Sequence, residues 1–293
     1  MQKDIKTFQQ KLLDAGYIAD ADLVTTLLLM QQLNRPLLIE GEAGVGKTEV
    51  AKALARTGDT DLIRLQCYEG LDTSSAVYEW NYTHQLLSIK LSENSGIKPD
   101  QREHQIFTEE FLLERPLLKA IRQSKPVVLL IDEIDRTDEA FEAFLLELLS
   151  DFQISIPELG TIRALSIPKV ILTSNGTREL SDALRRRCLY YYLDYPSPDR
   201  ELEIIRTRIP EIDSRLSGQI IHFINAVRDL DLQKRPGIAE TLDWSAALLG
   251  LGIKDLKDNP DTVFTSRTCL VKTRDDLVAL NKNMINKLVQ AIQ

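Results

Sequence analysis

Apolar residues near the start of the chain recur at the spacing of a helix. Residues three or four positions apart lie on one helical face, so the pattern predicts helical structure across residues 5–33. The glycine within residues 15–18 interrupts the pattern, and we expect a break between two helical parts there. The apolar positions that define the pattern are 5, 8, 12, 23, 27 and 30.

Short apolar runs further along predict the strands of a sheet. The run that begins at Val127 is continuous up to Ile131, which is typical of a parallel strand buried on both faces. Helical patterns lie between the runs, from Lys47 to Arg56, from Pro116 onward, and from Asp138 to Ser150. The five strand candidates are residues 36–40, 62–66, 127–133, 169–175 and 189–193.

A separate pair of strands is expected between residues 152 and 165. Residues 152–156 alternate between apolar and polar side chains, residues 157–160 contain proline and glycine, and residues 161–165 form a second strand-like run. Two such runs joined by a short turn predict a β-hairpin inserted between two strands of the sheet.

The pattern changes near residues 195–198, which contain two prolines. Beyond this point strand patterns largely vanish and helical patterns replace them. We therefore expect an α/β domain over residues 1–195, including an N-terminal helical segment at 1–34, and a small all-α domain over 196–293. The predicted helices of the second domain are residues 199–208, 214–230, 238–251 and 275–292.

Composition narrows the possible classes of protein. Hydrophobic residues make up 43% and charged residues 27%, as in ordinary globular proteins. The net charge of −8 argues against a large nucleic-acid-binding surface. No apolar run approaches the length that spans a bilayer, and the first residues lack the apolar core of a signal peptide. We therefore expect a cytoplasmic protein without a membrane span. The cysteines and histidines show no metal-ligand spacing.

The most informative motif lies between the strand at 36–40 and the helix from Lys47. Strand, glycine-rich turn and helix are the context of a P-loop, whose backbone N–H groups surround phosphates at a helix N-terminus. Lys47 is expected to contact the β- and γ-phosphates, Thr48 to ligate Mg²⁺, and Glu49 to belong to the same nucleotide-binding segment. The motif reads Gly41-Glu42-Ala43-Gly44-Val45-Gly46-Lys47-Thr48.

Two carboxylates, Asp132 and Glu133, end the buried strand at 127–133. In open parallel sheets ligands bind at the carboxyl ends of strands. We expect Asp132 to hold the Mg²⁺ shell and Glu133 to accept a proton from the water that attacks the γ-phosphate. The alternative is a solvated acidic turn at the start of a helix, which the upstream P-loop makes the weaker interpretation.

Asn175 ends the strand at 169–175. Its amide can orient the attacking water and sense the γ-phosphate in that position. The alternative is an asparagine that only forms a turn.

Three adjacent arginines, at 185, 186 and 187, precede the strand at 189–193. Such a cluster indicates an anionic partner, for example a phosphate of a nucleotide bound to a neighbouring subunit. A solvated basic turn is the alternative.

Tyr17 and Ile18 form an apolar pair upstream of the P-loop strand. Such a pair can pack on an adenine ring, or it can be ordinary core. The sequence favours neither interpretation over the other.

Together, these motifs resemble those of AAA+ ATPases. Residues 41–48 match Walker A, VVLLIDE at 127–133 matches Walker B, VILTSN at 170–175 matches the sensor-1 strand, and RRRC at 185–188 resembles the arginine-finger element. The hairpin at 152–165 looks like a pre-sensor-1 insertion, and the segment around 75–110 can hold a helix-2 insertion. Both insertions are typical of the branch that contains MoxR proteins and magnesium-chelatase ATPase subunits. The stretches CYEGLD, PELGTIRA, TSNGTREL and AETLDW are similar to MoxR proteins, near the CoxD-like members.

The resemblance implies a fold and a set of partners. The fold is a five-stranded parallel sheet in the order 5-1-4-3-2 with a C-terminal helical lid, and the assembly is a hexameric ring with ATP between subunits. Such proteins act as chaperones in enzyme maturation or cofactor insertion, with a von Willebrand factor A-domain partner. For CoxD-like members the client is a molybdenum hydroxylase.

The sequence departs from the family pattern at two places. A sensor-2 arginine is usual at the start of a lid helix, whereas the aligned turn here places Glu240 near that position and leaves Arg235 as a candidate substitute. The finger is usually one arginine before an aromatic residue; by position Arg187 matches best, and Arg186 is second.

The leading hypothesis is an Mg²⁺-dependent ATPase that remodels a protein client, namely a metalloenzyme under maturation. A nucleotide-gated DNA-binding motor is one alternative, although the acidic chain fits phosphate tracking poorly. A switch that uses ATP only to assemble is another, and the intact Asp132-Glu133 pair argues against it.

Overall fold

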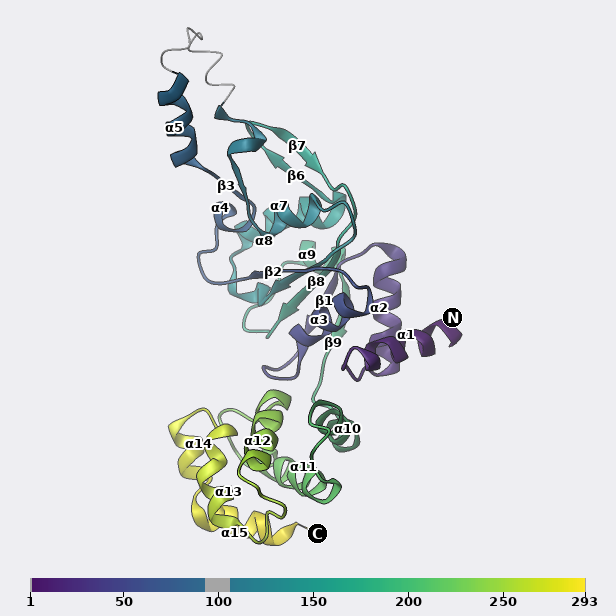
Figure 1. Cartoon of the computed structure of the whole chain (residues 1–293), viewed down its shortest axis with the longest axis vertical. Coiled ribbons are helices and arrows are strands. Elements are labelled where there is room, and N and C mark those ends of the chain that lie inside the picture. Colours follow the sequence, from purple (N-terminus) through teal and green to yellow (C-terminus); the bar gives the residue numbers. More distant parts are fainter. Residues whose placement is uncertain (1, 93–105, 293) are drawn as a thin grey trace. The chain divides into compact units, whose positions relative to one another are not determined.

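The computed structural model describes residues 2–92 and 106–292 (Figure 1). The chain packs as two compact units that alternate along the sequence. One unit comprises residues 1–20, 41–50 and 193–293, and the other comprises residues 21–40 and 51–192. The P-loop therefore belongs to the same unit as the C-terminal helices, whereas the predicted strands belong to the other unit.

The unit of residues 21–40 and 51–192 is built on a five-stranded parallel sheet in the order β2-β5-β8-β1-β9. Read from β9, this is the order 5-1-4-3-2, so the predicted α/β fold is confirmed. Because all neighbouring pairs are parallel, the carboxyl ends of the strands share one edge. The strands are β1 (Leu37–Glu40), β2 (Leu62–Gln66), β5 (Val128–Asp132), β8 (Lys169–Ser174) and β9 (Leu189–Tyr192).

Helices flank this sheet (Figure 1). Every residue of β5 is buried, as the continuous apolar run predicts for a central strand covered on both faces. Proline begins α7, where its missing N–H costs no hydrogen bond. The helices around the sheet include α2 (Ala21–Leu33), α3 (Lys47–Thr57), α4 (Thr73–Ala76), α7 (Pro116–Ile121), α8 (Glu139–Asp151) and α9 (Asp182–Arg187).

Two small antiparallel sheets complete this unit. The hairpin of β6 (Gln153–Ile156) and β7 (Gly160–Arg163) confirms the predicted insertion. The pairing of β3 (Tyr78–Trp80) with β4 (Leu112–Glu114) was not predicted, because the two short partners are far apart in sequence. Between them lie α5 (Tyr82–Ser92) and a 3₁₀ turn, Glu109–Phe111. Residues 93–105 of the expected helix-2 insertion lie outside the described residues.

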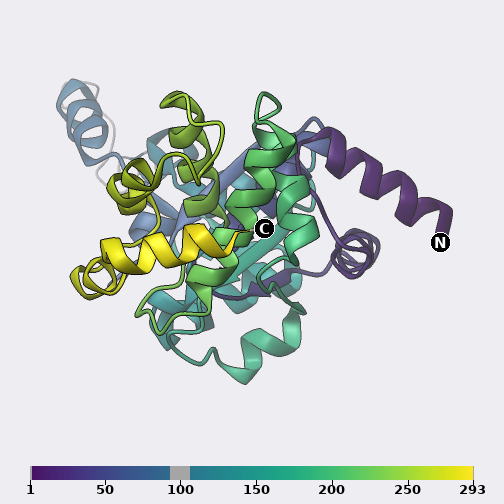
Figure 2. The same cartoon turned by 90° about the horizontal axis from the view of Figure 1, so that it is seen from below.

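The other unit comprises residues 1–20, 41–50 and 193–293. Every element described in it beyond residue 193 is a helix (Figures 1 and 2). Its core is centred on Trp244 and Phe223, whose ring centroids are 5.0 Å apart. The helical C-terminal region is therefore confirmed. Its helices are α10 (Pro198–Arg208), α11 (Ser214–Arg228), α12 (Ile238–Gly250), α13 (Pro260–Ser266), α14 (Arg274–Ala279) and α15 (Lys282–Ala291), and α1 (Gln2–Asp14) belongs to the same unit.

One helix prediction in this unit was wrong. The single helix expected over 275–292 is two helices, α14 and α15, because Asn281 forms an N-cap: its side-chain oxygen accepts a hydrogen bond from the N–H of Met284 at 3.0 Å. The seven-residue helix α13 was not predicted, since so short a segment carries little periodicity. The described helices are each too short or too polar to span a lipid bilayer.

Burial makes two of the three cysteines poor nucleophiles. Burial raises the pKa of the Cys67 thiol to about 12, helped by the nearby carboxylates of Asp132 and Asp135, and burial also raises the pKa of Cys188 to about 12. The thiolate is the reactive form, and it is scarce at pH 8 for both residues.

We therefore expect only Cys269, which is partly exposed, to react rapidly with a thiol reagent at pH 8 in the folded protein. The number of reacted thiols is read from the absorbance of the released chromophore. The same protein in denaturant, where all three cysteines should react, is the control. Rapid reaction of two or three thiols in the folded protein would contradict the burial described here.

Candidate functional site

The P-loop connects β1 to α3 and curls around the end of Lys47. Gly44 and Gly46 have φ of +82° and +98°, in the left-handed region that glycine adopts without strain. Lys47 is 7% exposed, and its ammonium donates hydrogen bonds to the carbonyl oxygens of Gly41 at 2.7 Å and Glu42 at 2.8 Å. The glycine-rich sequence thus produces the compact turn that the motif predicts.

Two close backbone approaches hold this loop within its unit. A Cβ atom on Gly41 would lie 2.2 Å from the carbonyl oxygen of Leu193. The N–H of Ile238, the first residue of α12, donates to the carbonyl oxygen of Gly44 at 3.0 Å. A Cβ atom on Gly237 would lie 2.8 Å from the same oxygen. Glycine is therefore required at positions 41 and 237, whatever their φ, because any side chain there would overlap a backbone carbonyl oxygen.

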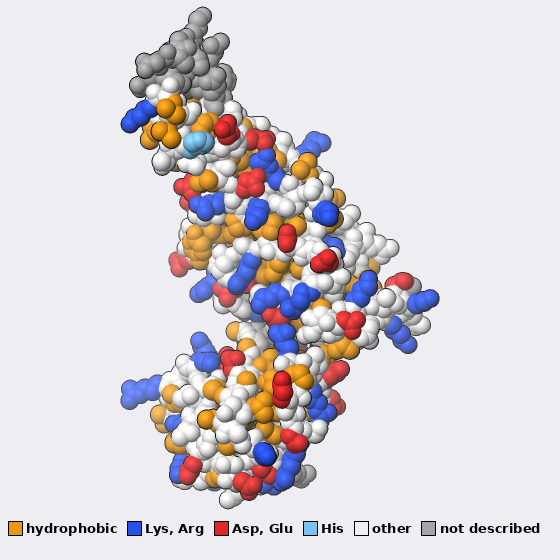
Figure 3. All heavy atoms as spheres, viewed as in Figure 1, with side chains coloured by type: hydrophobic (Ala, Val, Ile, Leu, Met, Phe, Trp, Pro, Cys, Tyr) orange, Lys and Arg blue, Asp and Glu red, His pale blue; other side chains and the backbone are white. Residues whose placement is uncertain are grey.

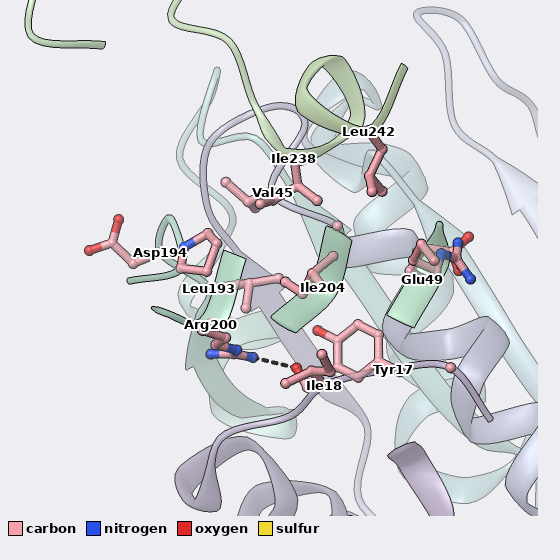
Figure 4. A pocket seen from close by; sticks show the side chains of 14 residues that line it. Tyr17, Ile18, Val45, Glu49, Leu193, Asp194, Arg200, Ile204, Ile238 and Leu242 are labelled. Atoms are coloured by element: carbon pink, nitrogen blue, oxygen red, sulfur yellow. Dashed lines mark hydrogen bonds and ion pairs between the residues drawn. The ribbon is translucent and has the colours of Figure 1, made fainter. Parts of the chain in front are cut away.

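A cavity beside the P-loop is lined mainly by apolar side chains (Figure 4). Tyr17 and Ile18 reach it from the N-terminal segment, and Val45, Gly46 and Glu49 reach it from the P-loop. The structure thus brings the two adenine candidates to the P-loop and places them on a cavity wall. Burial raises the pKa of the Tyr17 phenol, so its hydroxyl stays neutral at physiological pH. The other lining residues include Leu193, Asp194, Pro196, Ile204, Ile238 and Leu242.

Two arginines of α10 also line this cavity, and no motif in the sequence marks either of them. Arg200 donates to the carbonyl oxygen of Ile18 at 2.8 Å (Figure 4). It also pairs with Asp20 at 2.7 Å. Arg208 pairs with Glu49 at 3.3 Å. Arg200 therefore fixes the segment that carries Tyr17 and Ile18, a long-range contact without any local sequence signal.

The two sensor-2 candidates occupy different environments. The carboxylate of Glu240 accepts a hydrogen bond from the N–H of Gly237 at 3.0 Å and so caps α12. The same carboxylate oxygen lies 3.1 Å from the Cβ position built on Gly44. Arg235 is exposed and does not line the cavity. Of the two, Glu240 lies at the P-loop.

In the other unit, Asp132 and Glu133 follow β5 at the carboxyl edge of the sheet. Asp132 is 3% exposed, and one of its carboxylate oxygens accepts the hydroxyl hydrogen of Thr173 on the neighbouring strand β8. The N–H of Glu133 donates to the same Thr173 hydroxyl at 2.9 Å. Glu133 has a φ of +58°, which is unusual for a residue with a side chain and is common at functional sites.

Polar residues of β2 hold both carboxylates. Arg64 donates to the second carboxylate oxygen of Asp132 at 2.6 Å, and Gln66 donates to the carboxylate of Glu133 at 3.1 Å. Sequence reasoning missed these roles. The signal was the alternation of β2, in which Arg64 and Gln66 lie on the same exposed face.

A third buried carboxylate, that of Asp135, fixes the loop after β8. One of its oxygens accepts hydrogen bonds from the N–H of Asn175 at 3.2 Å, and from the N–H and hydroxyl of Thr177 at 3.0 and 2.7 Å. Asp135 is 3% exposed. The structure therefore brings Asp132, Glu133 and Asn175 to the same edge of the sheet, with the backbone of Asn175 held in place.

The three arginines form the last turn of α9 and differ in their contacts. Arg185 pairs with Glu40 at 3.4 Å, and Arg187 donates to the Ser150 hydroxyl and to the carbonyl oxygen of Ala183. Arg186 has an exposed side chain. Arg35 donates to the backbone carbonyls of Arg186 and Arg187, which fixes the end of this helix.

The residues expected to hold Mg²⁺ are chemically suited to it. The ion prefers oxygen ligands, and Thr48 and Asp132 offer a hydroxyl and a carboxylate. The Arg64 guanidinium already lies against Asp132, so the surroundings of this carboxylate accommodate a positive charge. The two residues belong to different compact units.

Comparison with known families identifies the class of protein. The model of the AAA family, ATPases associated with various cellular activities, matches residues 37–193, which is more than half of the chain. The chain belongs to this family. This membership confirms the expected class of enzyme, an ATPase.

Individual relatives are distant. The gas vesicle ATPase GvpN of Haloferax mediterranei is 26% identical over 67% of this chain and 57% of its own length. The gas vesicle ATPase GvpN2 of Halobacterium salinarum is 24% identical over 85% of this chain and 72% of its own length. An uncharacterised protein of Staphylococcus aureus is 28% identical over 80% of this chain and 82% of its own length. The chain spans little more than half of the Haloferax relative.

The contact between Gly237 and Gly44 predicts a difference between the glycine that precedes α12, Gly237, and the glycine that ends it, Gly250. Gly237→Ala should destabilise the protein by about 1–3 kcal/mol, because the new methyl group would overlap the Gly44 carbonyl. Gly250→Ala is the matched control: its Cβ would meet no atom within 4 Å, so the change should be neutral or stabilise by up to about 1 kcal/mol. Urea denaturation measures both. Equal stabilities of the two variants would show that the contact is not tight.

Proposed function

We propose that the protein is an Mg²⁺-dependent ATPase that remodels or matures a protein client, in the MoxR group and near its CoxD-like branch. The observation that carries this proposal is the grouping of Asp132, Glu133 and Asn175 at the carboxyl edge of the sheet, together with a P-loop at the end of β1. A carboxylate pair of this kind is needed for hydrolysis and not for nucleotide binding alone. The grouping therefore favours turnover over a switch that only assembles.

In this proposal each part of the site has one task. The P-loop, Gly41 to Glu49, holds the phosphates, with Lys47 supplying positive charge. Thr48 and Asp132 hold Mg²⁺, which when bound neutralises phosphate charge. Glu133 accepts the proton of the attacking water, and Gln66 orients its carboxylate. Asn175 positions that water. Tyr17 and Ile18 contact the base.

An arginine of α9 completes the site of a neighbouring subunit in a ring-shaped homo-oligomer, which we propose to be a hexamer. The contacts favour Arg186 for this role, because Arg187 and Arg185 are engaged within their own chain. Arg187 remains the alternative, since its position matches the family pattern best. At the P-loop we propose that Glu240 acts through the cap of α12, and that Arg235 reaches the nucleotide only if the exposed turn rearranges.

The surface supports a protein client. Helix α5 exposes a row of large apolar side chains, and hydrophobic side chains are visible on it in Figure 3. Exposed apolar rows of this kind are typical of protein-binding surfaces. We propose a metalloenzyme client of the molybdenum hydroxylase kind and a von Willebrand factor A-domain partner. The exposed residues are Tyr82, Leu86, Leu87 and Leu91.

The DNA-motor alternative finds no support in the hairpin. Its turn carries Glu158, and the chain is acidic overall, whereas a strand that tracks phosphates needs positive charge. The relatives named as gas vesicle ATPases offer a second kind of client, the gas vesicle, for the same chemistry.

Glu133→Gln tests the hydrolytic role. The variant should bind ATP as the parent does and lose about 10²–10⁴-fold in turnover, because the amide cannot accept the proton. Phosphate release measures turnover, and a fluorescent ATP analogue measures binding. Glu139→Gln, an exposed glutamate at the start of α8, is the control and should keep parental turnover. A Glu133→Gln protein as active as the parent would refute this mechanism.

Arg186→Ala and Arg187→Ala separate the two finger candidates. We expect Arg186→Ala to lower turnover by about 10³-fold with unchanged ADP affinity, because the missing charge acts on a neighbour's phosphate. Arg206→Ala, an exposed arginine in the last turn of α10, controls for loss of surface charge. If only Arg187→Ala loses turnover, Arg187 is the finger, and parental turnover in both variants would rule out the shared site.

A further inference from the structure

A buried ion pair joins two helices of the C-terminal region. Glu201 of α10 is 0% exposed, and its two carboxylate oxygens accept hydrogen bonds from the guanidinium of Arg228 of α11 at 2.6 and 2.7 Å. The hydroxyl of Thr241 of α12 donates to the same carboxylate at 2.9 Å. The pair is bidentate and well satisfied, which is the condition under which buried charges are tolerated.

A further donor of Arg228, its Nε–H, is directed at the backbone. Its Nε donates to the carbonyl oxygen of Pro236 at 2.8 Å, and the Tyr195 ring centroid lies 5.1 Å from the guanidinium carbon. A guanidinium is planar and rigid, so the bidentate bond to Glu201 also fixes the direction of Nε. The position of Pro236 is therefore set by the ion pair.

Pro236 is followed directly by the residues that contact the P-loop. Gly237 packs against Gly44, and the N–H of Ile238 donates to the Gly44 carbonyl at 3.0 Å. Ile238 and Leu242 then line the same cavity as Tyr17 and Val45 (Figure 4). An unbroken series of contacts leads from the ion pair through Pro236 to the cavity wall.

These contacts distinguish the pair from a purely stabilising one. A buried ion pair can often be replaced by apolar residues without loss of stability, so stability alone does not explain it. Here one donor is used to hold the turn before α12, and that turn forms part of the cavity.

We propose that Glu201 and Arg228 are positioning residues for nucleotide binding: they hold the start of α12 against the P-loop and so set the wall that faces the base. This inference rests on the proposed binding of ATP at the P-loop. It concerns the base, because the part of the cavity wall that α12 supplies, Ile238 and Leu242, is apolar, whereas the phosphates are held by the loop itself.

The test compares a ligand that has a base with one that lacks it. In Arg228→Lys the positive charge stays but the donor to Pro236 is lost, and in Glu201→Gln the negative charge is lost while Arg228 keeps its positive charge. Both variants should weaken MgADP binding by about 10-fold and leave the binding of tripolyphosphate unchanged, which a general loss of folding would not do. Isothermal titration calorimetry on the whole chain measures both ligands, and thermal denaturation measures stability.

Asp255→Asn is the matched control. Asp255 is also a buried carboxylate of the helical region, 7% exposed, and it accepts hydrogen bonds from Gln219 and from the N–H of Lys257 at 2.9 Å, away from the turn. The Asp255→Asn substitution should lower the melting temperature without changing the ratio of ADP to tripolyphosphate affinity. If Glu201→Gln does not fold, Thr241→Val takes its place; it removes the hydroxyl that contacts both Glu201 and the carbonyl oxygen of Gly237 in the turn.

The outcomes separate the two claims. The positioning role is overturned if the parent binds MgADP but the ratio of ADP to tripolyphosphate affinity in the variants stays parental, or shifts only as much as in Asp255→Asn. That result leaves the proposed function intact. A parent that binds neither ligand overturns the proposed function and this inference with it.

Discussion

The register between β5 and β8 is the constraint on which the candidate catalytic groups depend. Ile131 pairs with Leu172, so Asp132 lies beside Thr173, and the threonine hydroxyl can serve both Asp132 and the backbone of Glu133. A slip of one residue would turn Thr173 to the opposite face of the sheet and break both contacts. The buried apolar runs of the two strands fix this register, so core packing determines where the acidic groups lie.

Much of the α/β fold and of the motifs could be predicted, because their signals are local. The continuous run before Asp132, the glycines of the P-loop and the proline at the start of α7 each define their own structure. The pairing of β3 with β4 and the contacts of Arg64 with Asp132 could not be predicted in this way. They join residues distant in sequence, and only the folded chain brings them together.

The residues that the N-terminal and C-terminal segments bring to the P-loop also carry no local signal for their contacts. For Tyr17 and Ile18 the sequence allows either contact with the base or ordinary core packing. In the structure they line a cavity together with Val45 and Gly46. The glycine at 237 has ordinary backbone angles, so nothing local explains it; the nearby Gly44 carbonyl does. Two buried carboxylates, Asp135 and Glu201, likewise serve the backbone of neighbouring segments, directly or through Arg228. Buried polar residues that belong to no motif thus fix the segments around the motif residues.

The central claim is that the chain hydrolyses ATP at a site completed by a second copy of itself. Phosphate release from MgATP, measured as specific activity over a wide range of protein concentrations, tests it most directly. The account predicts that specific activity rises with concentration to a plateau and disappears when Mg²⁺ is chelated. Absence of phosphate release at every concentration would contradict hydrolysis, and a specific activity independent of concentration across the monomer–oligomer transition would contradict the shared site.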